Sequence, residues 1–423
     1  MRKLRSLFLA SLIVSAFATP MAVPSAFAET RSGAQAKDQE IARANLNAFN
    51  EAWQTVRDNF YDAKMEGLDW DLVGRRYRIF ADWPNADIAD IIKRMLAELR
   101  ASHTGYYTPD EIAYYDLADI FSRGLSRELA QRFPKGEVAY DGIGMATRVI
   151  DGRHFISGVY DGFPAAQAKL LVGDEIISAD GSAFAPVRSF AGKVGKTVRL
   201  TIRREAQGPP ITVEVTPQLL HPNDTYLAAM KNGARVIEKD GRKLAYVHVW
   251  SYARREYQDL LEELVEDRFK DADGLIWDLR DGWGGGQPYY LDIFNARAPT
   301  VTFKDRRSSG TQNARWRKPV VLIINGGSRS AKEILAYGFK KYGYGEVVGT
   351  RTTGAVLAGR AYIQSNGSLL LVAVSDVAVD DERLEGVGVA PDHEVPFDIR
   401  YAKGADPQLA AALDVLLRKL TSP

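Results

Sequence analysis

One strand-to-helix segment organises this chain: Lys318-Pro-Val-Val-Leu-Ile-Ile-Asn-Gly-Gly-Ser-Arg-Ser-Ala-Lys-Glu-Ile-Leu-Ala336. Residues 320–324 have the length and the β-branched side chains of a buried strand. The turn signal Asn325-Gly326-Gly327 ends this strand, and good helix formers follow from Ala331 onward. Ser330 is therefore expected at the junction where a strand passes into a helix.

A serine at such a junction has two ordinary explanations. The first N–H groups of a helix have no partner inside the helix, and the helix dipole favours negative charge there. This environment suits a nucleophile whose attack creates an oxyanion. Most serines in this context only cap the helix, and Ser328 or Ser330 could do that. The segment alone leaves both roles open.

The first 28 residues have the features of a secretory signal peptide. A basic start at residues 2–5 precedes a short apolar run at 7–18, and Ala26-Phe27-Ala28 is a small-x-small cleavage site. Removing the three leader cations takes the formal net charge from +1 to −2. No other stretch is long and apolar enough for a membrane span. We therefore expect a periplasmic or secreted protein with no membrane span and no bias toward nucleic acid.

Composition excludes several chemistries. The 423 residues include no cysteine, which excludes disulfides, zinc–thiolate sites and a cysteine nucleophile. The five histidines are scattered without an HExxH pattern, so we expect no metal and no cofactor. The 54 acidic residues single out no carboxylate pair for a glycosidase. Length indicates two or three domains.

Two glycine-containing motifs also fail to match common enzyme classes. Gly284-Gly285-Gly286 lacks the lysine and Ser/Thr of a P-loop, which makes phosphate binding improbable. The same glycines could present backbone N–H groups to a carbonyl oxygen. Ser330 does not stand in a G-x-S-x-G elbow, which disfavours an α/β-hydrolase.

Residues 29–125 form a helical N-terminal section in this interpretation. Apolar residues recur every three or four positions over 42–60, and helical patterns continue over 70–80 and 88–99. His103 lies just beyond the last of these helices, before Gly105 and a short strand or turn. A lone histidine there is most often a dipole partner or a packed ring. Its place at a junction keeps His103 a candidate base.

Residues 130–218 are rich in short strands and resemble a PDZ domain. The specific part runs from Gly162-Phe163-Pro164-Ala165-Ala166 through Gly173-Asp174-Glu175-Ile176-Ile177 to Asp180-Gly181. By that resemblance, the loop Gly142-Ile143-Gly144-Met145 offers backbone N–H groups to a peptide carboxylate, and the peptide adds a strand to the sheet edge. The alternative is a small barrel used only as a spacer or lid.

Residues 225–423 alternate strands with helices and predict an α/β section. Strands are expected over 243–249, 274–280, 345–349 and 369–374, with an amphipathic helix over 256–269. Polar and Gly-rich segments follow these strands, where sites usually form. Residues 218–225 are the expected hinge between the second and third sections.

Several motifs in order resemble the carboxyl-terminal processing (tail-specific) protease family. They are Asp278-Leu-Arg280 with its glycines, Asn325–Ile334, Thr352-Thr353-Gly354 after Val348-Gly349, and Glu385-Gly-Val-Gly-Val-Ala-Pro-Asp392. The resemblance covers almost the whole mature chain. It implies a multidomain α/β protein: a helical N-terminal section, a β-rich PDZ domain and a crotonase-like α/β catalytic section. It also implies that Ser330 is the nucleophile.

One departure distinguishes two branches of that family. The processing-protease branch has a catalytic lysine where this chain has Ala355, and Lys332 is expected to point away from Ser330. The branch similar to the tricorn protease core uses a histidine preceded by a serine, which Ser102-His103 matches. A glutamate of that branch matches Glu385. The resemblance therefore implies His103 as general base, with Ser102 and Glu385 as its relay.

The remaining site residues are assigned by the same resemblance. The oxyanion hole would combine the N–H of Ala331 with one from the glycine loop, for which we choose Gly285. A histidine near its ordinary pKa suits a base at neutral pH. His248 is expected to be a packed histidine, and His393 is the competing base.

Two functions remain open from the sequence. One is an exported serine endopeptidase that acts on polypeptides, with a PDZ domain that binds or gates their ends. The other is a non-catalytic exported peptide-binding or scaffold protein, which Ala355 motivates. A homo-oligomer is also left open.

Overall fold

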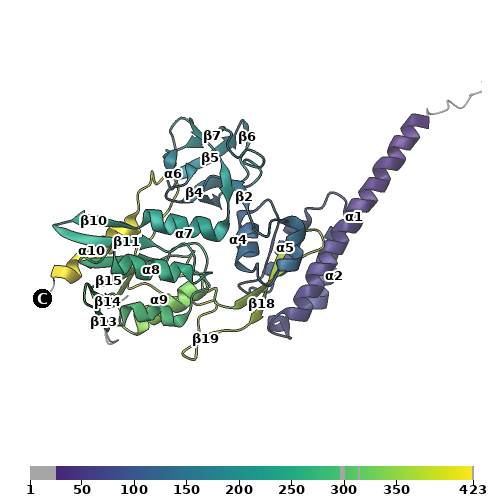
Figure 1. Ribbon diagram of the computed structural model, residues 1–423. Helices are drawn as coiled ribbons and strands as arrows, with labels where there is room; N and C mark the ends of the chain where they lie inside the picture. The colour runs from purple at the N-terminus through teal and green to yellow at the C-terminus, as the bar shows by residue number, and fades with distance from the viewer. Residues whose placement is uncertain (1–24, 296–300, 313–314, 422–423) are drawn as a thin grey trace, which may run out of the picture.

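The computed structural model describes residues 25–295, 301–312 and 315–421, with side chains described from residue 37 onward. The expected leader lies outside the described residues up to position 24, and helix α1 (Ser25–Asn59) begins within its end. Figure 1 shows an α/β body, a β-rich lobe above it and a helical section from which α1 extends away. Among the described residues, no helix has both the length and the apolar character needed to cross a bilayer.

The α/β body is built on a six-stranded sheet. Its strands lie in the order β10 (Arg235–Lys239), β11 (Arg242–His248), β12 (Gly274–Asp278), β15 (Val320–Ile324), β16 (Glu346–Gly349) and β21 (His393–Glu394). β10 is antiparallel to β11, and every other neighbouring pair is parallel. The predicted strands over 243–249, 274–280, 320–324 and 345–349 are confirmed, as is the expectation of a mixed α/β fold.

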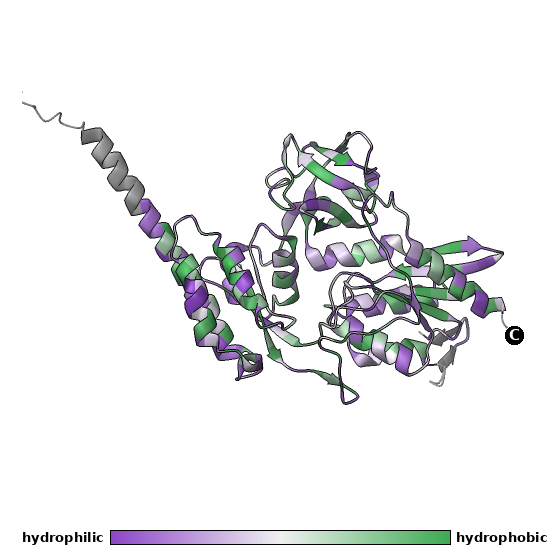
Figure 2. Cartoon of the chain, turned by 180° about the vertical axis from the view of Figure 1, so that it is seen from behind, coloured by the Kyte–Doolittle hydropathy of each residue, from purple (hydrophilic) through white to green (hydrophobic). Residues whose placement is uncertain are grey.

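Helices cover both faces of this sheet, as buried parallel strands require. On one face α10 (Pro407–Thr421) packs against Leu244, Ile276 and Val348. The other face is covered by α7 (Pro222–Gly233), α8 (Glu256–Glu266), α9 (Ala331–Lys341) and the 3-10 helix η2 (Pro288–Phe294). Figure 2 shows the apolar strands between helices of mixed character. Two short hairpins complete the body, β13 (Val301–Lys304) with β14 (Ser309–Gln312), and β19 (Ala378–Val379) with β20 (Glu382–Arg383).

The helical section shares a sheet with the C-terminal part of the chain. β1 (Gly105–Tyr107) pairs with β18 (Leu369–Ser375), which pairs in turn with β17 (Ala358–Ile363). One face of this sheet packs on α1, α2 (Trp70–Ala81) and α3 (Ile88–Ala97), beside the 3-10 turn η1 (Met65–Gly67). The other face packs on α4 (Ile112–Ile120) and α5 (Ser126–Arg132). The predicted helices over 42–60, 70–80 and 88–99 are confirmed, and His103 is fixed directly before β1.

The β-rich lobe is a separate sheet around its own core. Its strands are β3 (Met145–Ile150), β4 (Arg153–Val159), β5 (Glu175–Ala179), β6 (Ser182–Ala183), β7 (Val198–Arg203) and β8 (Ile211–Val215), with the short helix α6 (Pro164–Gln167). β3 lies at one edge of this sheet, next to β4. The PDZ assignment and the domain boundaries stay predictions.

The lobe joins the rest of the chain through β2 (Tyr140–Gly142) and β9 (Gln218–Leu220), which pair with each other. The expected hinge over 218–225 is therefore structured, because β9 and the first turn of α7 occupy it. These positions therefore form regular structure and are not a simple loop.

Candidate active site

Three loops meet at the carboxyl edge of the parallel sheet. They follow β12, β15 and β16 and carry residues 279–287, 325–330 and 350–357. In parallel α/β sheets this edge is where ligands usually bind, because neighbouring strands deliver their following loops to one place. The predicted strand–turn–helix around Ser330 lies at the centre of it.

Ser330 is held in a strained conformation at the start of α9. Its backbone φ is 57° and ψ is −133°, a region that non-glycine residues rarely adopt. Its N–H donates to the carbonyl of Ala355 at 2.7 Å. Buried Glu333 accepts the N–H groups of Gly354 and Ala355, both at 2.7 Å. These contacts fix the turn, and the Ser330 side chain makes no capping hydrogen bond to the helix.

Ser102, His103 and Glu385 form one hydrogen-bonded chain. The Ser102 hydroxyl donates to Glu385 Oε2 at 2.8 Å, and the Ser102 N–H donates to Glu385 Oε1 at 2.9 Å. Ser102 Oγ lies 3.0 Å from His103 Nδ1. The Val356 N–H also donates to Glu385, at 2.7 Å. Residues 283 positions apart are thus joined directly.

This chain of bonds determines which ring nitrogen carries the proton. Because the Ser102 hydrogen is used on Glu385, Ser102 Oγ accepts from His103 Nδ1–H. Nε2 is then left unprotonated and able to take a proton. Burial lowers the pKa of His103 to about 4, with a further lowering by Arg329 that Glu385 opposes. The expected ordinary pKa is therefore wrong for the free protein, and burial is the reason.

Ser330 and His103 are connected through the loop after β16, because Ala355 accepts the Ser330 N–H and the next residue, Val356, donates to Glu385. Within the described residues, no hydrogen bond links the Ser330 hydroxyl to the His103 ring. Catalytic hydrogen bonds are often long before substrate binds. Gly359 of β17 packs on the ring, since a β-carbon there would lie 3.1 Å from His103 Cβ.

The glycine loop lies directly against the serine. A β-carbon on Gly284 would be 2.6 Å from Ser330 Cβ and 2.9 Å from the Ala331 nitrogen. Gly285 has a φ of 103°, and a β-carbon there would meet the backbone of Ala253 at 2.7 Å. Gly284 is thus the loop residue in contact with Ser330, which the sequence did not single out. The oxyanion pair of Ala331 and Gly285 stays a prediction.

Lys332 points away from the serine, as expected. It is fully buried, and its ammonium group donates to the carbonyls of Asp281 at 2.7 Å and Trp250 at 3.2 Å. Burial lowers the pKa of Lys332 to about 7. The lysine therefore supports the start of the glycine loop. The only sequence signal for this role is a lysine among buried helix positions.

The other candidates lie elsewhere. His248 is partly buried and stacked on Trp250, with ring centroids 3.7 Å apart, and stays a packed histidine by this geometry. His393 pairs with Glu346 at the edge of the sheet and does not pair with Ser330 among the described residues. The loop Gly142-Ile143-Gly144-Met145 links β2 to β3, with Ile143 and Met145 buried. Among the described residues, no group of three metal-ligating side chains converges.

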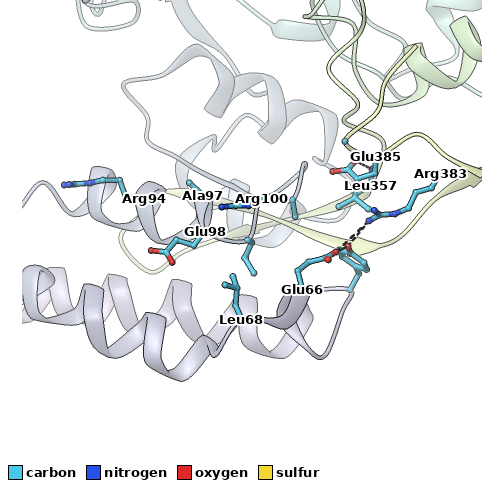
Figure 3. Close-up of a pocket in the computed structure, with 13 residues that line it drawn as sticks. Glu66, Leu68, Arg94, Ala97, Glu98, Arg100, Leu357, Arg383 and Glu385 are labelled. Atoms are coloured by element: carbon cyan, nitrogen blue, oxygen red, sulfur yellow. Dashed lines mark hydrogen bonds and ion pairs between the residues drawn. The ribbon is translucent and has the colours of Figure 1, made fainter. Parts of the chain in front are cut away.

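Two cavities flank the site. A cavity of about 720 Å³ is lined on one side by Glu385, Leu357 and Arg383 and on the other by residues of the helical section, among them Leu68 and Arg100 (Figure 3). A second cavity of about 470 Å³ extends from the β3 edge to Trp283 and Arg329. This second cavity runs from the edge strand β3 to Arg329, the residue before Ser330.

Two protein-family models match parts of this chain. The model of peptidase family S41 matches residues 243–395, and the tricorn protease C1 domain matches residues 43–97. Tricorn protease homolog 1 of Streptomyces coelicolor is 29% identical over 396 residues, which cover 88% of this chain but only 35% of that protein. A carboxyl-terminal-processing protease of Picosynechococcus sp. is 25% identical over 391 residues, 86% of this chain and 88% of that protein.

A solved structure supports the fold alone. The crystal structure of the tricorn protease is similar with a TM-score of 0.52 at 19% identity, covering 90% of this chain and 37% of that one. The chain thus spans about a third of the tricorn relatives and most of the processing protease.

Proposed function

The chain belongs to peptidase family S41, with the carboxyl-terminal processing and tricorn-like proteases, and from this premise we propose that it is a serine endopeptidase acting on polypeptides. The observation that carries the proposal is the chain of bonds from Glu385 through Ser102 to His103, together with the strained backbone of Ser330. A protein that only binds peptides has no need of a relay that leaves a ring nitrogen unprotonated.

The proposed reaction begins at the serine hydroxyl. His103 Nε2 takes the hydroxyl proton as Ser330 Oγ bonds to the peptide carbonyl carbon. The oxyanion is stabilised by the N–H groups of Ala331 and Gly285. Ser102 and Glu385 orient the ring and stabilise its positive charge. The proton passes to the leaving amine, and water then cleaves the acyl-enzyme by the same route.

Lys332 is the alternative base, because a lysine with a pKa of about 7 could accept a proton at neutral pH. Its bonds to two carbonyls favour a supporting role instead. The second candidate function is an exported peptide-binding or scaffold protein. It is favoured by Ala355, which stands where the processing branch has its lysine.

The β-rich lobe is proposed to bind the ends of polypeptides. Its β3 strand lies at a sheet edge, which suits addition of a peptide strand, and the loop over 142–145 precedes it. The cavity that begins at this edge leads toward Arg329. Export is proposed from the leader pattern, and the amino-terminal sequence of the exported product would test the cleavage after Ala28.

The deciding experiment measures turnover of casein by the mature chain and three variants. Ser330→Ala and His103→Ala should each lose at least about a thousand-fold in kcat. Lys332→Met should retain measurable turnover. Activity that survives His103→Ala but is lost in Lys332→Met would identify Lys332, and not His103, as the general base. Absence of turnover in every form, with peptide binding retained, would favour the scaffold function.

A further inference from the structure

Arg329 stands out among the charged residues of the cavity between β3 and the active site. These residues are Asp110, Glu111, Asp116, Arg148, Asp281 and Arg329. Arg148 pairs with Asp281, Asp110 with Arg188, and Glu111 with Lys93. Within the described chain, the guanidinium of Arg329 has no hydrogen bond and no ion pair; only its backbone carbonyl is used, by the Lys332 N–H. An arginine without a carboxylate partner in a partly enclosed site is a ready receptor for one.

The guanidinium of Arg329 is nevertheless held in place. It lies over the ring of Trp283, 4.4 Å from the centroid. Trp283 is fixed in turn, because its indole N–H donates to Asp116 Oδ2 at 3.0 Å. A cation stacked on a fixed aromatic ring loses little freedom on binding an anion. The residue also directly precedes Ser330, so its ligand would lie near the scissile bond.

A second unsatisfied atom lies in the same cavity. Asp116 is 5% exposed, and its Oδ1 has no hydrogen-bond partner, while Oδ2 is used by Trp283 and Tyr226. Asp116 therefore fixes the ring on which Arg329 lies and uses one of its two oxygens to do so. Burial raises the pKa of Asp116 to about 7, which weakens its competition for Arg329.

We propose that Arg329, stacked on Trp283, forms a substrate subsite that selects polypeptides carrying a carboxylate close to the cleaved bond. Arg329 binds the carboxylate, and Asp116 holds Trp283 in place for it. The carboxylate can belong to a Glu or Asp side chain or to the free carboxyl terminus. This specificity rests on the proposed function, since it describes substrate at the same serine.

Binding is measured first, without catalysis. The probes are fluorescein-labelled ten-residue peptides in which one Glu is moved along a neutral sequence, each with a matched Gln version. Both carboxyl-terminal acids and amides are made. Fluorescence anisotropy of the Ser330→Ala chain should show roughly ten-fold tighter binding of a Glu peptide, or of the acid, over its neutral match.

Variants then assign the preference to Arg329. In the Ser330→Ala background, Arg329→Gln should abolish the ratio, Arg329→Lys should keep part of it, and Arg329→Glu should favour a Lys peptide. Arg188→Gln is the matched control, because it removes one exposed arginine at the rim of the cavity. It should leave the ratio unchanged.

The outcomes separate the two proposals. Equal affinity for acidic and neutral peptides, or a preference that survives Arg329→Gln in a folded variant, would overturn the subsite. A preference seen in binding while the unmutated chain cleaves no peptide would retain the subsite and reject the protease. A Glu preference identifies a side-chain carboxylate, and an acid-over-amide preference identifies the chain end.

Discussion

The imidazole of His103 lies between two opposite charges, and this balance controls when it can act as a base. Burial disfavours its charged form, Arg329 disfavours it further, and Glu385 partly compensates through Ser102. The ring is therefore neutral over the whole physiological range. A low pKa makes a weaker base, but one that is always available.

This balance predicts the acid limb of the pH profile. Because activity needs the neutral ring, kcat/KM should fall only as the pH drops toward about 4, well below an ordinary histidine. Arg329→Gln removes a lowering charge, so the limb should move to higher pH. A limb near pH 6.5 in the unmutated chain would contradict this. Arg188→Gln should leave the profile where it is.

Lys332 makes a prediction about stability. Its folded pKa of about 7 lies below the ordinary lysine value of 10.5, so the unfolded chain binds more protons between these pH values. The lysine therefore costs stability below pH 7, and this cost fades as the pH rises. The stability of the unmutated chain relative to Lys332→Met should increase by about 2 kcal/mol from pH 7 to pH 9.

Denaturant unfolding followed by tryptophan fluorescence measures this difference, since other titrating groups are shared by both chains. A constant difference across that range would show that Lys332 stays charged when folded. Lys332 would then support the glycine loop as an ammonium ion at every physiological pH.

At the scale of elements, the candidate active site depends on the β17–β18 hairpin. This hairpin lies in the C-terminal half of the sequence but packs on the N-terminal helices. β17 and β18 leave the α/β body and form a sheet with β1. Leu370 and Val372 then pack in the core of the N-terminal helices. This exchange brings His103, which lies just before β1, against Gly359 of β17.

The sequence predicts the strands and helices well but not this pairing. A continuous apolar run identifies 320–324, whose five residues are all buried, and helical periodicity identifies 256–269 and 88–99, where each helix buries one apolar face. β1 is only three residues long, and nothing in Gly105-Tyr106-Tyr107 names Leu369–Ser375 as its partner. The family resemblance predicts the roles of Ser102, His103 and Glu385. No sequence motif indicates the contacts that Lys332, Gly284 and Arg329 make.

The hairpin gives a direct test at Gly359. A β-carbon there would lie 3.0 Å from Leu371 Cδ1, 3.1 Å from His103 Cβ and 3.3 Å from His103 Cδ2. Leu371 can turn its side-chain end away, but His103 must shift by a few tenths of an ångström to accommodate Gly359→Ala. Because catalysis depends on sub-ångström placement, kcat should fall about ten-fold or more while the melting temperature changes little.

Gly124→Ala is the matched control, since its β-carbon would meet only a carbonyl oxygen at 3.6 Å. It should not change kcat. Equal kcat values for Gly359→Ala and the unmutated chain would show that His103 tolerates the shift, and would weaken its assignment as base.

At the scale of the whole molecule, one segment of the C-terminal part of the chain links the β-rich lobe to the α/β body. A cavity of about 680 Å³ separates part of the lobe from the carboxyl edge of the parallel sheet. The segment 399–404, which precedes α10, bridges the two. Tyr401 N–H donates to Gly173 and Gly404 N–H donates to Val172, each at 3.0 Å.

Tyr401 is the centre of this bridge. Its hydroxyl donates to Glu175 at 2.7 Å, and its ring meets Phe155 edge-on with centroids 5.2 Å apart. Gly173 must be glycine here, because a β-carbon would lie 2.4 Å from the Ala402 nitrogen. The proposed delivery of a bound chain end to Ser330 requires that this bridge keeps the β3 edge facing the active site.

Tyr401→Ala should therefore loosen the lobe without unfolding the body. Losing the ring contact and the hydroxyl bond should cost about 2 kcal/mol locally, and Tyr401→Phe, which loses only the hydroxyl bond, about 1 kcal/mol. Hydrogen exchange should rise at residues 153–159 and 172–175 and stay unchanged in β12 and β15. Cleavage of long polypeptides should fall more than cleavage of short peptides, because only the long ones reach both the lobe and the serine. Exchange that rises equally in β15 would mean that lobe and body form one cooperative unit, and the lobe would then be a fixed wall of the active site.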